Sequence, residues 1–175
     1  LGLASSALLW GYRVRLGAVG LTACFTYIFL IDQTYYQNHW VLILWLGLFF
    51  TVVGSEYAER RWALWLLRFQ VGVVYAFAGI AKLNADWMVG QPMDIWLSMR
   101  SHWPLIGGWI NQEGVAVGLS WAGLAFDLCI VPFLLWRRTR RSAFWCAVLF
   151  HAANAVLFKI GIFPILMVVL TTVFL

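Results

Sequence analysis

Lys82 is the residue of this chain whose type and position are best suited to chemistry. It follows an apolar run from Trp62 to Ala81 and stands directly before the polar turn Leu83-Asn-Ala-Asp-Trp87. Apolar surroundings remove hydration from an ammonium and favour the neutral amine, which can accept a proton from a weak acid or attack a carbonyl carbon. On position alone, the commoner interpretation is a lysine that extends to the membrane surface as an anchor.

The helix expected over residues 62–81 carries small and polar residues along one side. At about 100° per residue, one stripe continues as far as the lysine, and it consists of Arg68, Gly72, Tyr75, Gly79 and Lys82. Glycines allow a second helix to approach closely. The stripe therefore predicts that this face turns toward other helices and away from lipid.

Composition indicates a membrane protein. Hydrophobic residues make up 63% of the 175 residues and charged residues 11%, whereas a soluble domain has roughly 25% charged residues. The net charge of +5 comes from short basic patches between apolar runs, which favours a lipid bilayer over a nucleic-acid partner. Because the sequence starts without Met and stops inside an apolar run, we expect a piece of a longer polypeptide.

The apolar runs predict an all-α fold, a polytopic bundle of membrane helices in a single domain over residues 1–175. We expect about six spans, at roughly 14–31, 40–54, 62–81, 115–136, 142–158 and 163–175. Prolines and glycines break residues 84–113 too often for a span. Within that segment, residues 93–99 predict a short helix at the membrane surface.

Arginines predict the orientation of the spans. If the spans alternate across the membrane, nine of the 12 basic residues fall on one side, and only Lys82, Arg100 and Lys159 fall on the other. The positive-inside rule makes the arginine-rich side cytoplasmic. The active side is then non-cytoplasmic, where separate segments gather a set of polar residues: Asp32, Thr34, Asn38, His39, Lys82, Asn84, Asp86 and His102.

Three further polar residues lie deeper in the predicted spans: Asp127, His151 and Asn154. Ionisable side chains at membrane depth are costly, so they usually face a cavity or a partner. His151 and Asn154 are three residues apart and share a helix face. For Asp127, a structural hydrogen bond to a neighbouring helix is an equally good interpretation.

Several enzyme classes find no support in the sequence. It has no HExxH, no GxSxG and no phosphate-binding loop, which counts against hydrolase and nucleotide chemistry. Cys24, Cys129 and Cys146 are well separated in apolar runs, so we expect buried thiols and neither a disulfide nor a metal cluster. Without a CxxC pair, a thiol-driven quinone reductase is also disfavoured. We predict no metal site.

Four blocks of the sequence resemble the membrane domain of vitamin K-dependent gamma-glutamyl carboxylase and its bacterial relatives, also called the horizontally transferred transmembrane domain. The most specific is Gly79-Ile-Ala-Lys-Leu-Asn-Ala-Asp-Trp87, which combines a rare lysine with a fixed following turn, inside the larger block 67–93. The other blocks are residues 30–39, 124–128 and 150–164. Together they extend the resemblance over nearly the whole chain.

The resemblance implies an integral membrane lyase that couples oxygenation of reduced vitamin K, the hydroquinone, to gamma-carboxylation of glutamate in a peptide or protein. Oxygen and carbon dioxide are the implied co-substrates. Lys82 matches the base that deprotonates the hydroquinone, and His39 matches a histidine of the same active site. Candidate substrate- or quinone-binding residues complete the set: Asp32, Asn38, Tyr75, Asp127, His151 and Asn154.

Departures from the family pattern leave two other functions open. The charged segment 55–61 is shorter than in animal members, Ala81 stands where they carry another lysine, and the soluble peptide-binding domain lies outside this sequence. One alternative is a relative that uses its quinone chamber on another acceptor. The other is a non-enzymatic membrane bundle in which Lys82 is an anchor.

Overall fold

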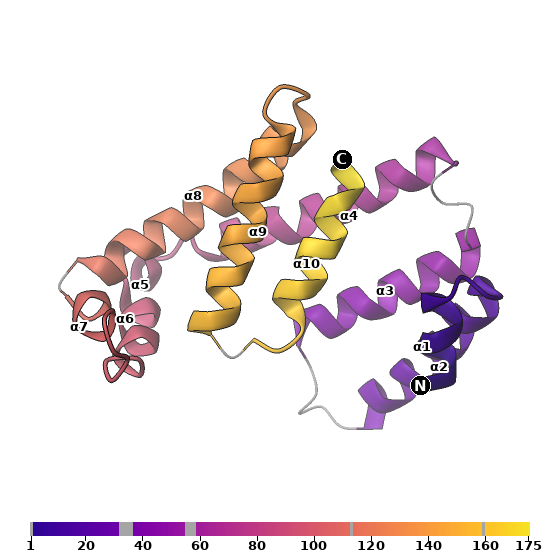
Figure 1. The fold of residues 1–175 in the computed structure, drawn as a ribbon, viewed down its shortest axis with the longest axis horizontal. Helices are drawn as coiled ribbons and strands as arrows, with labels where there is room; N and C mark the ends of the chain where they lie inside the picture. Colours follow the sequence, from indigo (N-terminus) through magenta and orange to yellow (C-terminus); the bar gives the residue numbers. More distant parts are fainter. Residues whose placement is uncertain (1, 32–36, 55–58, 113, 159) are drawn as a thin grey trace. The chain divides into compact units, whose positions relative to one another are not determined.

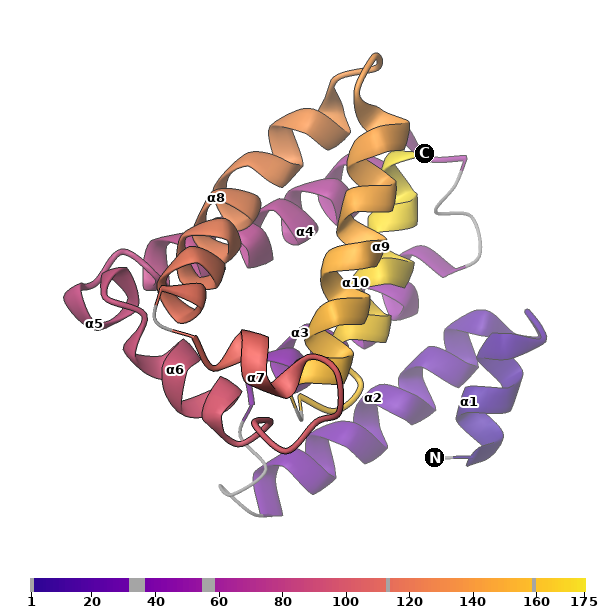
Figure 2. The same cartoon turned by 60° about the vertical axis from the view of Figure 1, so that its left-hand side comes forward.

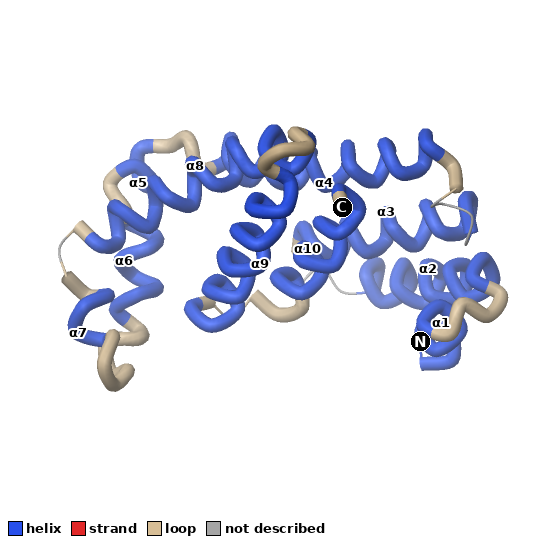
Figure 3. The backbone as a smooth tube through the Cα atoms, turned by 45° about the horizontal axis from the view of Figure 1, so that its top comes forward, coloured by secondary structure: helices blue, strands red, loops and turns tan. Residues whose placement is uncertain are grey.

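The computed structural model describes residues 2–31, 37–54, 59–112, 114–158 and 160–175. Within these ranges the chain forms helices joined by turns, without any strand (Figure 3). Helices satisfy their backbone hydrogen bonds internally, which is what the interior of a bilayer requires of a spanning segment. The predicted all-α fold is confirmed.

Two compact units make up the chain, residues 1–66 and residues 67–175. Helix α4 (Arg61–Ala81) contains the boundary between them. The first unit holds α1 (Gly2–Leu9), α2 (Val14–Ile31) and α3 (Asn38–Val53), and both α1 and α3 pack against α2 (Figure 1). His39 belongs to the first unit, whereas Lys82 belongs to the second.

The second unit continues from α4 through a series of short and long helices. In Figure 2, α8 and α9 form a hairpin, α10 lies beside α9, and the short helices α5 to α7 pack against α8. The bounds of these elements are α5 (Ala85–Met88), α6 (Gln91–Ser98), α7 (Gly107–Ile110), α8 (Val115–Leu135), α9 (Arg140–Leu157), α10 (Phe163–Thr171) and the 3₁₀ helix η3 (Thr172–Phe174).

Among the described residues, three helices are long and apolar enough to cross a membrane, namely α2, α4 and α8. The segments His39–Val53 and Phe163–Phe174 are apolar but shorter. Helix α9 has 18 residues, but its first turn begins with Arg140 and Arg141, and its second half contains His151 and Asn154. These polar residues lower its hydropathy below that of the three long helices. The total of six spans stays a prediction.

Two glycines of α4 face α8, as the stripe of small residues predicted. A Cβ atom on Gly79 would lie 2.5 Å from Leu128 Cδ2 and 3.5 Å from Asp127 Cβ, and one on Gly72 would lie 3.6 Å from Val131 Cγ1. The missing side chain at Gly79 is therefore what lets α8 approach α4 at the level of Asp127. This close contact places the acidic residue next to the end of α4.

The segment between α4 and α8 folds back on the first half of α8. Its helix α6 confirms the short helix predicted over residues 93–99. Gly90 precedes α6 with φ of +76°, and a Cβ there would lie 2.8 Å from the backbone nitrogen of Val117 in α8. A small apolar core forms between α6, α7 and α8 from Met93, Leu97, Ile110 and Ala116. This segment therefore forms a packed cap beside α8.

Candidate functional site

Lys82 forms an ion pair with Asp127. Its Nζ atom lies 2.5 Å from Asp127 Oδ2 and also donates a hydrogen bond to Ala78 O at 3.3 Å. The Asp127 side chain is 5% exposed and that of Lys82 is 20% exposed. Asp127 lies near the middle of α8. Lys82 thus turns its ammonium toward a buried carboxylate on another helix, which an anchor at the membrane surface would not do.

The turn after Lys82 is fixed by its own side chains. Asn84 caps α5, because its Oδ1 accepts a hydrogen bond from Trp87 N at 2.9 Å. The cap brings the Trp87 ring under the lysine, with Nζ 5.1 Å from the ring centroid. Trp87 Nε1 then donates to Ser120 O in α8 at 2.7 Å. Trp87 therefore connects the turn to α8 and gives Lys82 a cation–π contact.

A small residue stands opposite this turn. A Cβ on Gly123 would lie 4.0 Å from Lys82 Cε and 3.9 Å from the Trp87 ring. Glycine at this position leaves the space beside the lysine stem free of any side chain from α8. Larger residues at position 123 would fill that space and would cover the lysine on this side.

A second polar group lies about two helical turns before Lys82 on α4. Tyr75 Oη lies 2.8 Å from His151 Nε2 and 3.4 Å from Thr171 Oγ1. Tyr75 and His151 are each 2% exposed, and Thr171 is fully buried. Thr171 Oγ1 also donates to Met167 O at 2.7 Å. Helices α4, α9 and α10 are thus joined by a buried network of neutral side chains.

Aromatic rings surround this network. The rings of Phe126 and Phe150 stack with their centroids 3.7 Å apart, and Tyr75 meets the Phe126 ring edge-on at 5.8 Å. Phe163 meets the His151 ring edge-on at 6.2 Å. Phe126 directly precedes Asp127 in α8, so the aromatic wall and the Lys82–Asp127 pair use neighbouring positions of one helix.

Two buried polar atoms have no hydrogen-bond partner among the described residues, His151 Nδ1 and Ser120 Oγ. Leaving such atoms unpaired costs roughly 1–3 kcal/mol each, so buried polar atoms in folded proteins normally have a partner. Ser120 lies in the same turn of α8 as Gly123 and next to Trp87. A water molecule or a polar ligand that reached His151 Nδ1 or Ser120 Oγ would therefore gain a hydrogen bond.

The chain matches one family model along its length. The model is that of the HTTM domain, and it matches residues 1–60 and 56–175. The chain belongs to the HTTM domain family. This is the transmembrane domain found in the vitamin K-dependent gamma-glutamyl carboxylase family, so the resemblance inferred from the sequence blocks is confirmed. No solved structure matches the chain.

Family membership and the apolar helices together make this HTTM domain an integral membrane protein. The second unit contains Lys82, Tyr75, Asp127 and His151, and it connects them in two pairs. Asn154 lies half-buried one turn after His151 on α9. No described contact joins its side chain to either pair.

The remaining candidates of the HTTM domain lie in or before the first unit's helix α3. His39 is half-buried in the first turn of α3, with its ring 6.4 Å from that of Trp40. Asn38 begins α3, but its side chain lies outside the described residues, as does Asp32. The predicted convergence of His39 and Lys82 on one cavity therefore stays a prediction.

Sequence reasoning missed several residues of the second unit. It treated Asp127 as deeper than Lys82 and did not pair the two, and it gave no role to Ser120 or Thr171. Asn84 was a usable signal, because Asn is a favoured N-cap residue and indicates that a new helix begins directly after Lys82. The cysteines are free, but Cys129 and Cys146 are exposed. The prediction of buried thiols is wrong for these two, which lie on the outer faces of α8 and α9.

Proposed function

We propose that this HTTM domain is the membrane part of a lyase that couples oxygenation of reduced vitamin K to gamma-carboxylation of peptide glutamate, with Lys82 as the base. Membership of the HTTM domain family supports the general class, a membrane domain of the carboxylase family. The observation that carries the proposal is the Lys82–Asp127 pair, which holds an amine against a buried carboxylate beside an aromatic ring. An anchor at the surface needs neither partner.

The residues around Lys82 and Tyr75 fit a hydroquinone. Such a ligand presents two hydroxyl groups on a flat apolar ring, so it needs a proton acceptor, hydrogen-bond partners and aromatic walls. Lys82 supplies the acceptor, Trp87 and Phe126 supply ring faces, and His151 Nδ1 and Ser120 Oγ are buried polar atoms without a described partner. Tyr75, His151 and Asn154 are proposed to line the chamber.

Reduced vitamin K would supply the electrons for oxygen and an acidic hydroxyl proton. For the chain's own part, Lys82 serves as the base only after the ammonium of the Lys82–Asp127 pair has released its proton; the amine then takes up one proton from the hydroquinone, and the Asp127 carboxylate stabilises the ammonium that forms again. After the transfer, the Lys82 ammonium and the Asp127 carboxylate together carry no net charge, which suits a site of low dielectric constant. Trp87 holds the amine from the other side and keeps the lysine stem directed at α8.

Residues of the first unit complete the proposal. We assign His39, with Asn38 beside it, to a step after oxygenation, and Asp32 to substrate binding. The site faces the non-cytoplasmic side, as the distribution of arginines predicts. Oxygen and carbon dioxide enter as co-substrates, and a glutamate-containing peptide is the acceptor.

The test measures two products in parallel. The protein is reconstituted in lipid nanodiscs with reduced vitamin K, oxygen, bicarbonate and a glutamate-containing peptide, and both the epoxide and carboxyglutamate are quantified. Wild type should form both, and Lys82→Ala should form neither. Arg138→Ala, which removes an exposed cation far along the chain, serves as the matched control and should keep both activities.

The other outcomes distinguish the alternatives. Epoxide without carboxyglutamate from wild type would indicate a relative that oxidises the quinone for another acceptor. Equal product from Lys82→Ala and wild type would overturn the base assignment. If wild type forms neither product while remaining folded, the non-enzymatic bundle becomes the better interpretation.

A further inference from the structure

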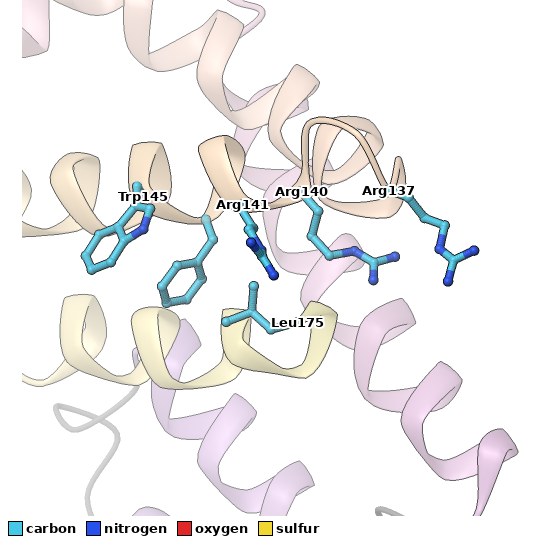
Figure 4. A pocket seen from close by; sticks show the side chains of 6 residues that line it. Arg137, Arg140, Arg141, Trp145 and Leu175 are labelled. Carbon is cyan, nitrogen blue, oxygen red and sulfur yellow. The ribbon is translucent and has the colours of Figure 1, made fainter.

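A pocket of about 540 Å³ lies at the opposite end of α8 from the α5 to α7 cap. It is lined by Arg137, Arg140, Arg141, Phe144, Trp145 and Leu175. Figure 4 shows the labelled arginine side chains on one side of the α9 ribbon, with Trp145 further along the same helix and Leu175 facing them. The lining therefore combines cations, aromatic rings and one aliphatic side chain.

Among the residues that the structure describes, no carboxylate pairs with an arginine of this pocket. No Asp or Glu follows Asp127 in the sequence, and Arg137 and Arg141 form no ion pair with any described residue. Both side chains are exposed. The Arg140 guanidinium instead donates to backbone carbonyl oxygens, its Nε to Leu134 O at 3.1 Å and its Nη2 to Leu135 O at 3.4 Å. The uncompensated charges thus belong mainly to Arg137 and Arg141.

The segments around the pocket have the features expected at a membrane boundary. Helix α8, long and apolar enough to cross a bilayer, ends at Leu135, two residues before Arg137. Trp136 and Trp145 are more than half exposed, and tryptophan prefers the headgroup region of a bilayer. Fixed cations at this depth meet lipid phosphates directly, because the phosphates form the outer limit of the hydrocarbon region.

We propose that this pocket binds the phosphodiester of an anionic glycerophospholipid. Arg137 and Arg141 contact the phosphate, Arg140 forms the rigid wall between them, and Trp145 and Phe144 pack against the glycerol and the first acyl carbons. Guanidinium groups suit phosphate because their planar donors bind two oxygens at once. The ligand removes the repulsion between neighbouring arginines, which the protein alone leaves uncompensated.

Native mass spectrometry of the detergent-purified protein tests the proposal. Phosphatidylglycerol and zwitterionic phosphatidylcholine are titrated separately, and bound lipid is counted for wild type, Arg137→Gln, Arg141→Gln and the double variant. Arg138→Gln is the matched control, because Arg138 lies in the same loop but does not line the pocket. At about 1 kcal/mol per arginine, each single change should weaken phosphatidylglycerol binding roughly fivefold and the double change roughly 25-fold.

Phosphatidylcholine carries the same phosphodiester, but its choline cation offsets the charge of the phosphate, so it should bind more weakly than phosphatidylglycerol and lose less affinity in each variant. Arg138→Gln should leave both lipids unaffected within twofold. Inorganic phosphate is added as a competitor to separate a lipid site from a free-phosphate site. Displacement of the lipid by millimolar phosphate would assign the pocket to free phosphate and would overturn the lipid proposal. Equal binding of both lipids by wild type, or an equal loss in Arg138→Gln and Arg137→Gln, would overturn it as well.

Discussion

Lys82 and the arginines of residues 137–141 occupy corresponding places on two helices. Both α4 and α8 can cross a membrane; Lys82 follows directly on α4, and Arg137 comes two residues after the end of α8. Lys82 turns inward, where it meets Asp127. Arg137 and Arg141 remain exposed and line a pocket without a carboxylate. The same position at a helix end has therefore produced an internal pair in one case and a surface cluster in the other.

The local turns explain much of this difference. After α4, Asn84 caps a new helix at once and Trp87 reaches back to α8, so the lysine is enclosed. After α8, Thr139 and Arg140 bond to the last carbonyls of the helix, with Thr139 Oγ1 donating to Phe133 O at 2.8 Å. That turn ends α8 without covering the neighbouring arginines. Charge alone does not distinguish an inward-facing cation from an exposed one, but the ion-pair partner and the local turn do.

The largest effect is expected from Lys82→Arg. Arginine keeps the positive charge and can bind the Asp127 carboxylate, but a guanidinium stays protonated and cannot accept a proton. Turnover should fall by a factor of about 10² to 10⁴, the usual contribution of a general base, while the protein stays folded. Parallel assays of epoxide and carboxyglutamate measure this, with Arg141→Lys as the matched exchange in the surface cluster. If Lys82→Arg kept more than a tenth of wild-type turnover, Lys82 would not act as a base. The proposed chemical difference between Lys82 and the exposed arginines would then be contradicted.

The next effect concerns stability. Asp127→Ala leaves the lysine charge without its carboxylate and should lower the free energy of unfolding by about 3 kcal/mol. Joint replacement, Lys82→Met with Asp127→Leu, should recover most of that loss because no unpaired charge remains. Unfolding in mixed micelles with increasing denaturing detergent measures both. Asp94→Ala, at an exposed position, is the control and should stay within about 0.5 kcal/mol of wild type.

A smaller effect is expected where the interior pair is neutral. Tyr75→Phe removes the hydroxyl that lies 2.8 Å from His151 Nε2, so neither ring nitrogen of His151 keeps a described partner. The cost should be about 1 kcal/mol, within the range measured for hydrogen bonds between membrane helices. Tyr27→Phe changes a tyrosine that is 69% exposed and should have no measurable effect. A loss as large as that of Asp127→Ala would show that charge is not what distinguishes the Lys82 pair.

The smallest effect should come from Arg137→Gln. Its exposed side chain has no described ion pair, so the free energy of unfolding in a neutral detergent should change by less than about 0.5 kcal/mol. The same micelle unfolding assay measures it. If Arg137→Gln destabilised the protein as strongly as Asp127→Ala, the surface cluster would have an internal role and the comparison between the two helix ends would fail.

Local features of the fold were predictable from the sequence. Apolar length located α2, α4 and α8, and the small-residue stripe identified Gly72 and Gly79 as the contact with a second helix. Both depend on neighbouring positions in one segment, where hydropathy and helical periodicity act directly. The short helix α6 was predictable for the same reason, because Gly90 and Pro92 mark its start.

The pairing of side chains across helices was not predictable. Lys82 and Asp127 are separated by 45 residues, and their contact depends on the offset and tilt of α4 against α8, which hydropathy does not specify. The depth of a residue along its own helix suggested that the two lie at different levels. The Tyr75–His151 contact likewise depends on the rotation of α9 about its axis. The sequence grouped these four residues only as candidates of one site, through the polar stripe, the cost of ionisable side chains at membrane depth and the family resemblance, and it specified no contact between them.

The distance along the chain between Lys82 and Asp127 has a consequence for biosynthesis. Ribosomes add roughly 5–20 residues per second, so Asp127, 45 residues later, follows Lys82 after about 2–9 s. During this interval we expect α4 to enter the bilayer with its lysine extended to the surface, where water solvates the ammonium. When α8 arrives, the lysine exchanges water for the carboxylate. We therefore expect the surface-extended lysine and the lysine paired with Asp127 to be successive states of one side chain, the first during insertion and the second in the finished protein.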